Sequence, residues 1–156
     1  NEKMGPSTGF VVPEIAKSYG AIGSLINHSE HRIEMSSIAS LVERMRKLGM
    51  VSIVCAQEPH EVVEISTLQP DFIAIEPPEL IGSGRAVSKE NPAIITKSIQ
   101  GAGSRSSIIC GAGITDKDDV AKAMELGSRG ILVASGIVKA NSWEKKIAEL
   151  ASGMKG

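Results

Sequence analysis

One stretch of the sequence joins a carboxylate, a stiff loop and a glycine turn within nine residues. The buried-strand pattern Asp71–Ile75 runs into Glu76, which is followed by Pro77-Pro78-Glu79-Leu80-Ile81 and then by Gly82-Ser83-Gly84. A carboxylate at the end of a buried strand is a candidate general base, because a dry setting can tune it for proton transfer. The proline-stiffened loop is a candidate lid, and the Gly-Ser-Gly turn is a candidate phosphate cradle.

Three further polar or glycine-rich segments follow strand-like runs. They are Asn27-His28-Ser29-Glu30, Gly111-Ala112-Gly113 and Ser135-Gly136. Small residues let backbone N–H groups approach an anion closely, so the last two segments are candidate phosphate-binding turns. Glu79 competes with Glu76 as a base, but its place inside the loop favours a solvated or hinge position.

The elements that must position these residues alternate between strand and helix patterns. Apolar runs rich in β-branched residues predict strands. Amphipathic segments with start and stop signals predict helices between them. The predicted strands are Ala21–Asn27, Val51–Ala56, Asp71–Ile75, Ser107–Cys110 and Gly130–Ala134. The predicted helices are Glu14–Tyr19, Ile38–Leu48, His60–Leu68, Ala93–Gln100, Asp118–Leu126 and Trp143–Met154.

This alternation predicts a parallel α/β sheet covered by helices. A doubly wound sheet gathers its ligand at one switch point, whereas a (β/α)₈ TIM barrel places functional residues after many strands. Because polar segments follow at least four strands here, we expect the barrel. A barrel needs roughly 200 to 250 residues, and the chain has 156. We therefore expect one domain, residues 1–156, that forms the carboxyl-terminal portion of a barrel, about strands 4 to 8, with the first three βα units absent.

The composition limits which kinds of partner can be expected for this chain. A formal net charge of −1 and a pI near 6.4 give no electrostatic reason to expect nucleic acid. No apolar stretch of about 18 residues marks a membrane span, and no leader is evident. Cys55 and Cys110 lie in apolar runs, which predicts buried free thiols in a reducing, cytoplasmic setting. The three His and two Cys lack ligand spacing, so no metal site is expected.

Taken together, these motifs resemble the triosephosphate isomerase family, especially its short archaeal form. The resemblance covers essentially the whole chain, and four motifs in order carry it. They are Asn27-His28-Ser29-Glu30, Glu76-Pro77-Pro78-Glu79-Leu80-Ile81-Gly82-Ser83-Gly84, Cys110-Gly111-Ala112-Gly113-Ile114 and Ala134-Ser135-Gly136-Ile137-Val138-Lys139. The implied activity interconverts dihydroxyacetone phosphate and glyceraldehyde 3-phosphate by proton transfer through an enediolate.

The resemblance also implies roles for individual residues. Glu76 takes the place of the catalytic base, and His28 takes that of the neutral imidazole that polarises the substrate carbonyl, a division of labour described for this enzyme. Asn27, Ser29 and Glu30 are implied as supporting polar groups. Backbone N–H groups are implied to bind the substrate phosphate at Gly82, Gly111, Ala112, Gly113, Ser135 and Gly136.

The resemblance implies further properties of the whole molecule. Pro77–Gly84 is implied as the mobile lid, with a small phosphorylated three-carbon substrate, no cofactor, and a homo-dimer or homo-tetramer. The family places a lysine at the end of its first strand to oppose the phosphate, and none of this chain's lysines lies in a matching motif. Lys139 belongs to the last βα connection.

Two alternatives remain open. The missing lysine motivates the first, a phosphate-binding barrel fragment with no catalysis of its own. The second is another phosphate-using (β/α)₈ enzyme, such as a synthase of thiamine or tryptophan precursors. Such enzymes lack the pairing of His-Ser-Glu with Glu-Pro-Pro that this chain carries.

Overall fold

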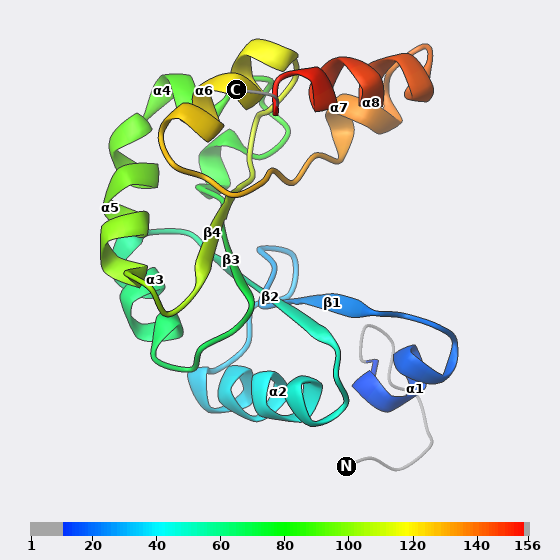
Figure 1. Ribbon diagram of the computed structural model, residues 1–156, viewed down its shortest axis with the longest axis vertical. Coiled ribbons are helices and arrows are strands. Elements are labelled where there is room, and N and C mark those ends of the chain that lie inside the picture. The colour runs from blue at the N-terminus through cyan, green and yellow to red at the C-terminus, as the bar shows by residue number, and fades with distance from the viewer. Residues whose placement is uncertain (1–10, 155–156) are drawn as a thin grey trace.

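A four-stranded parallel sheet forms the centre of the protein, shown in Figure 1. The structure is a computed structural model that describes residues 11–154. The strands are β1 (Gly23–Ile26), β2 (Val51–Ala56), β3 (Phe72–Ile75) and β4 (Ser107–Cys110), and they lie side by side in chain order. Because all of them run parallel, their carboxyl ends meet at one edge, where the predicted site residues follow.

Helices and turns connect the strands and continue beyond them. Before and among the first three strands lie α1 (Pro13–Ser18), α2 (Met35–Lys47) and α3 (Pro59–Ser66). Between β3 and β4 the chain forms the 3₁₀ turn η1 (Pro78–Leu80), α4 (Val87–Glu90) and α5 (Pro92–Ala102). After β4 come α6 (Lys117–Glu125), α7 (Ser135–Val138) and α8 (Trp143–Ser152).

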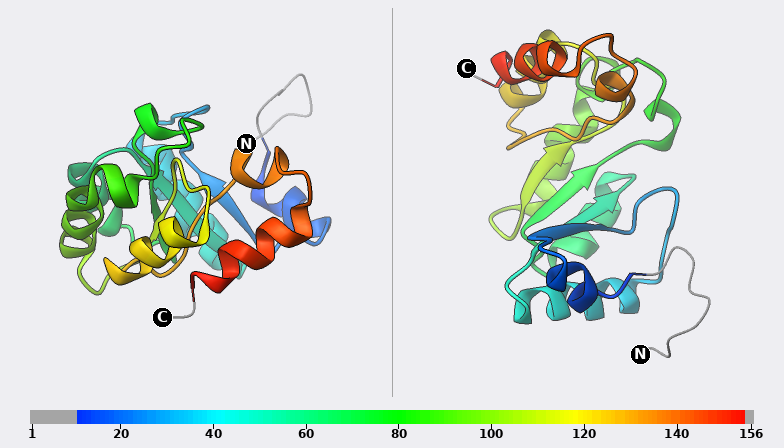
Figure 2. Two further views of the ribbon diagram at one scale, coloured as in Figure 1. Left: turned by 90° about the horizontal axis from the view of Figure 1, so that it is seen from above. Right: turned by 90° about the vertical axis from the view of Figure 1, so that its right-hand side faces the viewer.

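The units follow a curved path rather than a flat layer. The right-hand view of Figure 2 places α1 and α8 at opposite ends of this path, with the sheet between them. Helices α2, α3 and α5 pack on one face of the sheet, as Figure 1 shows. No described helix covers the other face. Helices on one face only are what part of a (β/α)₈ barrel would show, because the helices of a barrel form a ring outside its strands. Within residues 11–154, no helix is long and apolar enough to span a lipid bilayer.

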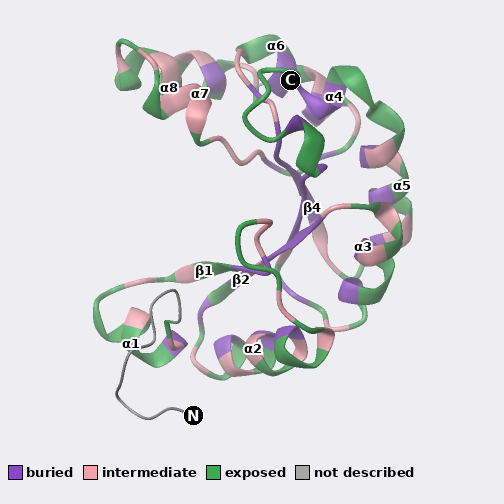
Figure 3. Cartoon of the chain, turned by 180° about the vertical axis from the view of Figure 1, so that it is seen from behind, coloured by how far each residue is buried: buried purple, intermediate pink, exposed green. Residues whose placement is uncertain are grey.

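Strand alternation sorts the core into two clusters, and most of the sheet is buried in Figure 3. Side chains directed at the helices, such as Val54, Ile73 and Ile108, belong to the main core. Their neighbours Cys55, Ala74 and Ile109 form a second, smaller cluster, because successive side chains in a strand point to opposite faces. Residues in this second cluster would face the interior of a barrel.

The predicted helices and four of the five predicted strands have observed counterparts, and the short elements η1, α4 and α7 were not predicted. The predicted strand Gly130–Ala134 contributes only a single parallel bridge between Cys110 and Ile131. Two hydrogen bonds support the bridge, from Cys110 N to Gly130 O and from Leu132 N to Cys110 O, each 2.9 Å. The ladder then ends because Ala134 leaves the extended region, with φ −114° and ψ −79°, to begin α7.

Helix α6 begins with a reciprocal capping box. The Asp116 side chain accepts a hydrogen bond from Asp119 N at 2.8 Å, and the Asp119 side chain accepts one from Asp116 N at 3.3 Å. The N-cap residue of α6 is therefore Asp116. Such a pair satisfies two N–H groups that the helix itself cannot.

Replacing Asp116 by alanine is expected to cost about 1 kcal/mol of unfolding free energy, because it removes the side-chain acceptor at the N-cap. For a chain of this size that loss lowers Tm by roughly 2–4 °C. Thermal unfolding followed by circular dichroism measures it. Asp118→Ala is the matched control, since Asp118 is exposed in the same turn. Equal Tm values for the two variants would contradict the capping assignment.

Candidate functional site

Glu76 lies buried immediately after β3, with only 8% of its surface exposed. Its backbone N–H donates to Ala56 O at 2.8 Å, which continues the sheet pattern by one residue. Since Ile75 points toward the helices, alternation directs Glu76 to the opposite face, with Ala74. Its Oε2 atom is buried and has no hydrogen-bond partner in the described part of the chain. A buried carboxylate oxygen of this kind is free to accept a proton from a ligand.

His28 faces this carboxylate from the end of β1. Its Nε2 lies 3.9 Å from Oε2 of Glu76, and its Nδ1 accepts a hydrogen bond from Glu30 N at 3.3 Å. A neutral imidazole that accepts at Nδ1 carries its proton on Nε2. The hydrogen-bond donor of a neutral His28 is therefore the nitrogen beside Glu76.

Asn27 holds the His28 loop in shape. Its Nδ2 donates to Cys55 O and its Oδ1 accepts from Ile33 N, each at 3.0 Å. These bonds anchor both ends of the loop and stabilise a left-handed backbone, φ 63°, at Asn27 itself, a conformation that Asn tolerates better than most residues. Asn27 therefore fixes the backbone of the loop that carries His28.

The two other predicted supporting residues differ in their contacts. The exposed Glu30 carboxylate lies 3.6 Å from Nδ1 of His28. The half-buried Ser29 side chain makes no hydrogen bond to His28 or Glu76 among residues 11–154. Of the pair, only Glu30 touches the catalytic candidates.

The turn after β4 lies against both Glu76 and the end of the lid. A Cβ atom at Gly111 would overlap the Glu76 carboxyl group, and one at Gly113 would overlap the carbonyl of Arg85. Ala112 and Gly113 are both left-handed, with φ 68° and 73°. Glycine at positions 111 and 113 therefore lets the turn pack directly against Glu76 on one side and against Arg85, the residue after the lid, on the other.

The second small-residue turn lies beside the first. A Cβ atom at Gly136 would stand 2.8 Å from Ile114 O, so α7 begins directly against the β4–α6 connection. Within residues 11–154, the N–H groups of Ala112, Gly113, Ser135 and Gly136 have no protein acceptor. Gly111 differs, since its N–H donates to Ile75 O at 3.1 Å. That N–H group is therefore part of the sheet hydrogen bonding. The lack of a side chain at Gly111 leaves room for the Glu76 carboxylate.

The predicted lid, Pro77–Gly84, is anchored at its base and projects at its tip. Pro77 and Leu80 are buried, while Gly82 and Gly84 adopt φ 70° and 74° in open space. The Ser83 hydroxyl donates to Leu80 O at 2.8 Å and accepts from Arg85 N at 3.0 Å. Glu79 is exposed, in agreement with a solvated position rather than a catalytic one.

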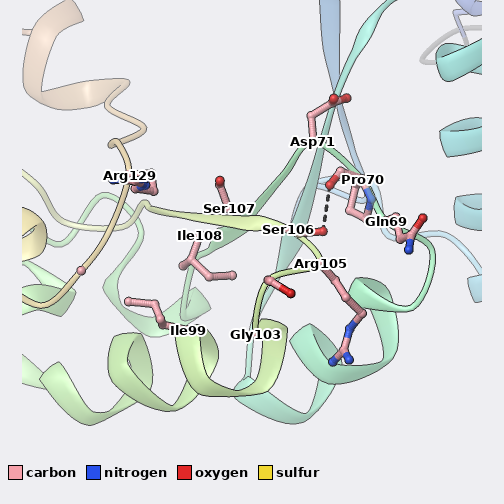
Figure 4. A pocket seen from close by; sticks show the side chains of 12 residues that line it. Gln69, Pro70, Asp71, Ile99, Gly103, Arg105, Ser106, Ser107, Ile108 and Arg129 are labelled. Carbon is pink, nitrogen blue, oxygen red and sulfur yellow. Dashed lines mark hydrogen bonds between the residues drawn. The ribbon is translucent and has the colours of Figure 1, made fainter.

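A pocket of about 450 Å³ lies at the amino ends of β3 and β4, at the opposite edge of the sheet. Figure 4 shows its lining, which includes Asp71, Arg105, Ser107 and Arg129. It holds none of the predicted site residues. The Arg105 guanidinium is already bonded to Ser66 Oγ and Gly101 O. This pocket is therefore separate from the candidate site at the carboxyl edge of the sheet.

Both cysteines are buried free thiols, as predicted. Burial, followed by the negative charge of Glu76, raises the pKa of the Cys55 thiol far above its usual range. Burial, followed by the charges of Glu76 and Asp119, raises the pKa of Cys110 to about 12. Neither thiol is a nucleophile at neutral pH.

We expect neither cysteine to react with iodoacetamide at pH 8 while the protein is folded, because the thiolate is the reactive form and burial blocks access. Both should be alkylated in guanidinium chloride. Mass spectrometry counts the added groups, and the unfolded sample is the control. Alkylation of either residue in the native protein, at the rate of a free thiol, would refute this burial.

Comparison with known proteins places the chain among named relatives. A family model described as triosephosphate isomerase matches residues 1–151. The triosephosphate isomerase of Cenarchaeum symbiosum is 53% identical over 154 residues, which cover 97% of this chain and 69% of that protein. The corresponding protein of Archaeoglobus fulgidus is 44% identical over 150 residues, covering 94% and 67%. The chain thus spans about two thirds of the length of these relatives.

Solved structures confirm the fold class. Thiamine phosphate pyrophosphorylase from Pyrococcus furiosus superimposes with a TM-score of 0.70 at 16% identity, covering 91% of this chain and 63% of that one. A tryptophan synthase α-subunit from the same organism gives 0.69 at 18% identity, covering 88% and 57%. At these identities the likeness concerns the fold alone, and it agrees with part of a (β/α)₈ barrel.

Proposed function

The chain belongs to the triosephosphate isomerase family, and from this premise we propose that His28 and Glu76 carry out the isomerisation of triose phosphates. The substrates are dihydroxyacetone phosphate and glyceraldehyde 3-phosphate, interconverted through an enediolate. The observation that carries the proposal is the approach of Nε2 of His28 to within 3.9 Å of the unpartnered Oε2 of Glu76. This pair places a base and a hydrogen-bond donor at one point.

Glu76 serves as the base that moves a proton between two substrate carbons. The carbon acid is weak, so the carboxylate must meet it without competing water. Burial of Glu76 and the absence of a partner on Oε2 meet this requirement. The proton removed from one carbon stays on Oε2 until the neighbouring carbon takes it.

His28 serves as the electrophile. Removal of the proton leaves negative charge on the substrate carbonyl oxygen, which an N–H donor stabilises in place. Because Nδ1 accepts from Glu30 N, the proton of the neutral ring is on Nε2 and points into the site. The same nitrogen can return a proton to either oxygen of the enediolate.

The substrate phosphate binds to the N–H groups of Ala112, Gly113, Ser135 and Gly136, with Gly82 added by the lid. The first four have no protein acceptor in the described chain. The lid Pro77–Gly84 closes over the intermediate and keeps out water that would promote loss of phosphate.

The lack of a counterpart to the family's lysine in this chain motivates one alternative, a phosphate-binding protein without turnover. No lysine of this chain stands in a matching motif. To separate the two functions, the conversion of glyceraldehyde 3-phosphate to dihydroxyacetone phosphate is measured with the native protein. Turnover supports the isomerase. Binding of a phosphorylated enediolate mimic without turnover establishes the alternative.

We also infer that the native protein is a cytoplasmic homo-dimer or homo-tetramer. The buried free thiols are compatible with a reducing compartment, and large apolar side chains such as Ile22 and Trp143 are exposed on this chain. Sedimentation equilibrium tests the assembly, and a monomer at micromolar concentration would reject it.

A further inference from the structure

One buried carboxylate takes no part in the proposed proton transfers. Asp119, in the first turn of α6, is only 3% exposed. Its Oδ2 accepts hydrogen bonds from Thr115 N at 2.8 Å, Thr115 Oγ1 at 2.9 Å and Asp116 N at 3.3 Å. One oxygen therefore holds the end of the turn that begins at Gly111.

The other oxygen of Asp119 binds the segment that follows the lid. Lys89 of α4 approaches Oδ1 with its Nζ at 2.6 Å. The neighbouring Ser88 hydroxyl donates to the Asp119 carbonyl at 2.9 Å in a buried position. Val87 N donates to Ala112 O at 3.3 Å, at the other end of the turn. Of three successive residues beyond the lid, Val87 is thus bonded to the β4–α6 connection, and Ser88 and Lys89 are bonded to the first turn of α6.

These contacts link two parts of the phosphate site. On one side is the turn Ala112–Thr115, whose left-handed Ala112 and Gly113 offer free N–H groups. On the other side is the segment Arg85–Lys89, which connects the lid to α5. The Arg85 carbonyl also packs where a side chain at Gly113 would lie. A shift of either part must displace the other or break these bonds.

We propose that Asp119 is a positioning residue that fixes the phosphate-binding turn Ala112–Thr115 and fastens it, through Lys89, to the segment Arg85–Lys89 that follows the lid. The inference rests on the proposed function, because it assigns the turn to the substrate phosphate. Asp119 does not touch the substrate. It keeps the turn in a single conformation, so that the phosphate donors are in place before the substrate arrives.

The chemistry of the carboxylate explains why an acid occupies this position. Burial alone would raise the pKa of Asp119, but hydrogen bonds from Lys89, from the Thr115 backbone and hydroxyl, and from Asp116 N outweigh it and lower the pKa. Asparagine could still accept from Thr115, but it cannot pair with the Lys89 ammonium. The charge of Asp119 is therefore required for the link to the segment that follows the lid, and less so for holding the turn.

The test measures phosphate binding, so that it does not depend on turnover. In Asp119→Asn, the dissociation constant for inorganic phosphate and the KM for the triose phosphate are expected to rise about 3- to 30-fold, while kcat falls less. Lys89 is half-exposed, and Lys89→Met should likewise raise the dissociation constant and the KM. Lys89→Arg, which keeps the positive charge, should have values close to those of the parent protein. Asp118→Asn is the matched control, with the same loss of charge on the same turn.

Hydrogen–deuterium exchange gives a second readout that a general loss of stability would not reproduce. Lys89→Met should speed exchange in residues 111–116 and in residues 85–90, and leave α2 unchanged. Parental phosphate affinity and KM in both Asp119→Asn and Lys89→Met, with only Tm lowered, would overturn the inference. Failure of the proposed function is distinct from that result, since the parent protein itself would then neither bind phosphate nor turn over triose phosphate.

Discussion

Replacing Glu76 by glutamine is expected to lower the kcat of triose phosphate isomerisation by about 10²- to 10⁴-fold, the usual contribution of a general base. The amide has nearly the shape of the carboxylate but cannot take a proton from carbon. KM is expected to change little, because the proposed phosphate donors are backbone N–H groups of other residues, which the substitution leaves in place. The same change removes a buried charge whose Oε2 has no partner, so we expect the free energy of unfolding not to fall. Activity and stability would then move independently, as they do where a site is strained for function.

The matched control for this experiment is Glu64→Gln, which makes the same chemical change on the exposed face of α3. Steady-state assays in both directions of the reaction, with denaturant unfolding of each variant, separate the two effects. Full activity in Glu76→Gln would remove the base assignment and favour another phosphate-using barrel enzyme. A large loss in Glu64→Gln would show that the assay reports on folding instead.

The sequence carried enough signal to predict the parallel sheet and the position of Glu76 at the end of β3. β-Branched apolar runs gave β2 and β4 with their observed bounds, because a strand buried on both faces excludes polar residues. Parallel strands end at one edge, so His28 and Glu76 could be expected to converge although 48 positions separate them in the sequence. Their approach to 3.9 Å follows from that topology.

Other features depend on contacts that no local pattern records. Gly130–Ala134 has the composition of a strand, but with one paired neighbour it forms a single bridge before Ala134 turns into α7. Gly111 reads as one more phosphate donor, and only the sheet register shows that its N–H binds Ile75 O. Asp119 reads as an ordinary first-turn acid. Its pairing with Lys89 joins residues 30 positions apart, which periodicity does not reveal.

Replacing Gly111 by alanine is expected to disable Glu76 without removing it. The new Cβ would overlap the Glu76 carboxyl group, with Oε1, Cγ and Cδ its three nearest atoms. The backbone cannot withdraw, because Gly111 N donates to Ile75 O within a buried strand edge. The carboxylate must therefore move, and a misplacement of about 1 Å can cost roughly 10²-fold in rate. We expect a loss of that size in kcat, with the phosphate affinity preserved.

Two further variants decide whether the loss arises at Glu76. Gly101→Ala is the control for crowding, since its Cβ would stand 2.8 Å from Val63 Cγ2 on the helical side of the molecule, and it should retain full activity. The double variant Gly111→Ala/Glu76→Gln should be no slower than Glu76→Gln alone, because both changes remove the same interaction and their effects cannot add. If the two losses multiply instead, Gly111 acts through a different group, and the contact between Gly111 and the Glu76 carboxylate does not position the base.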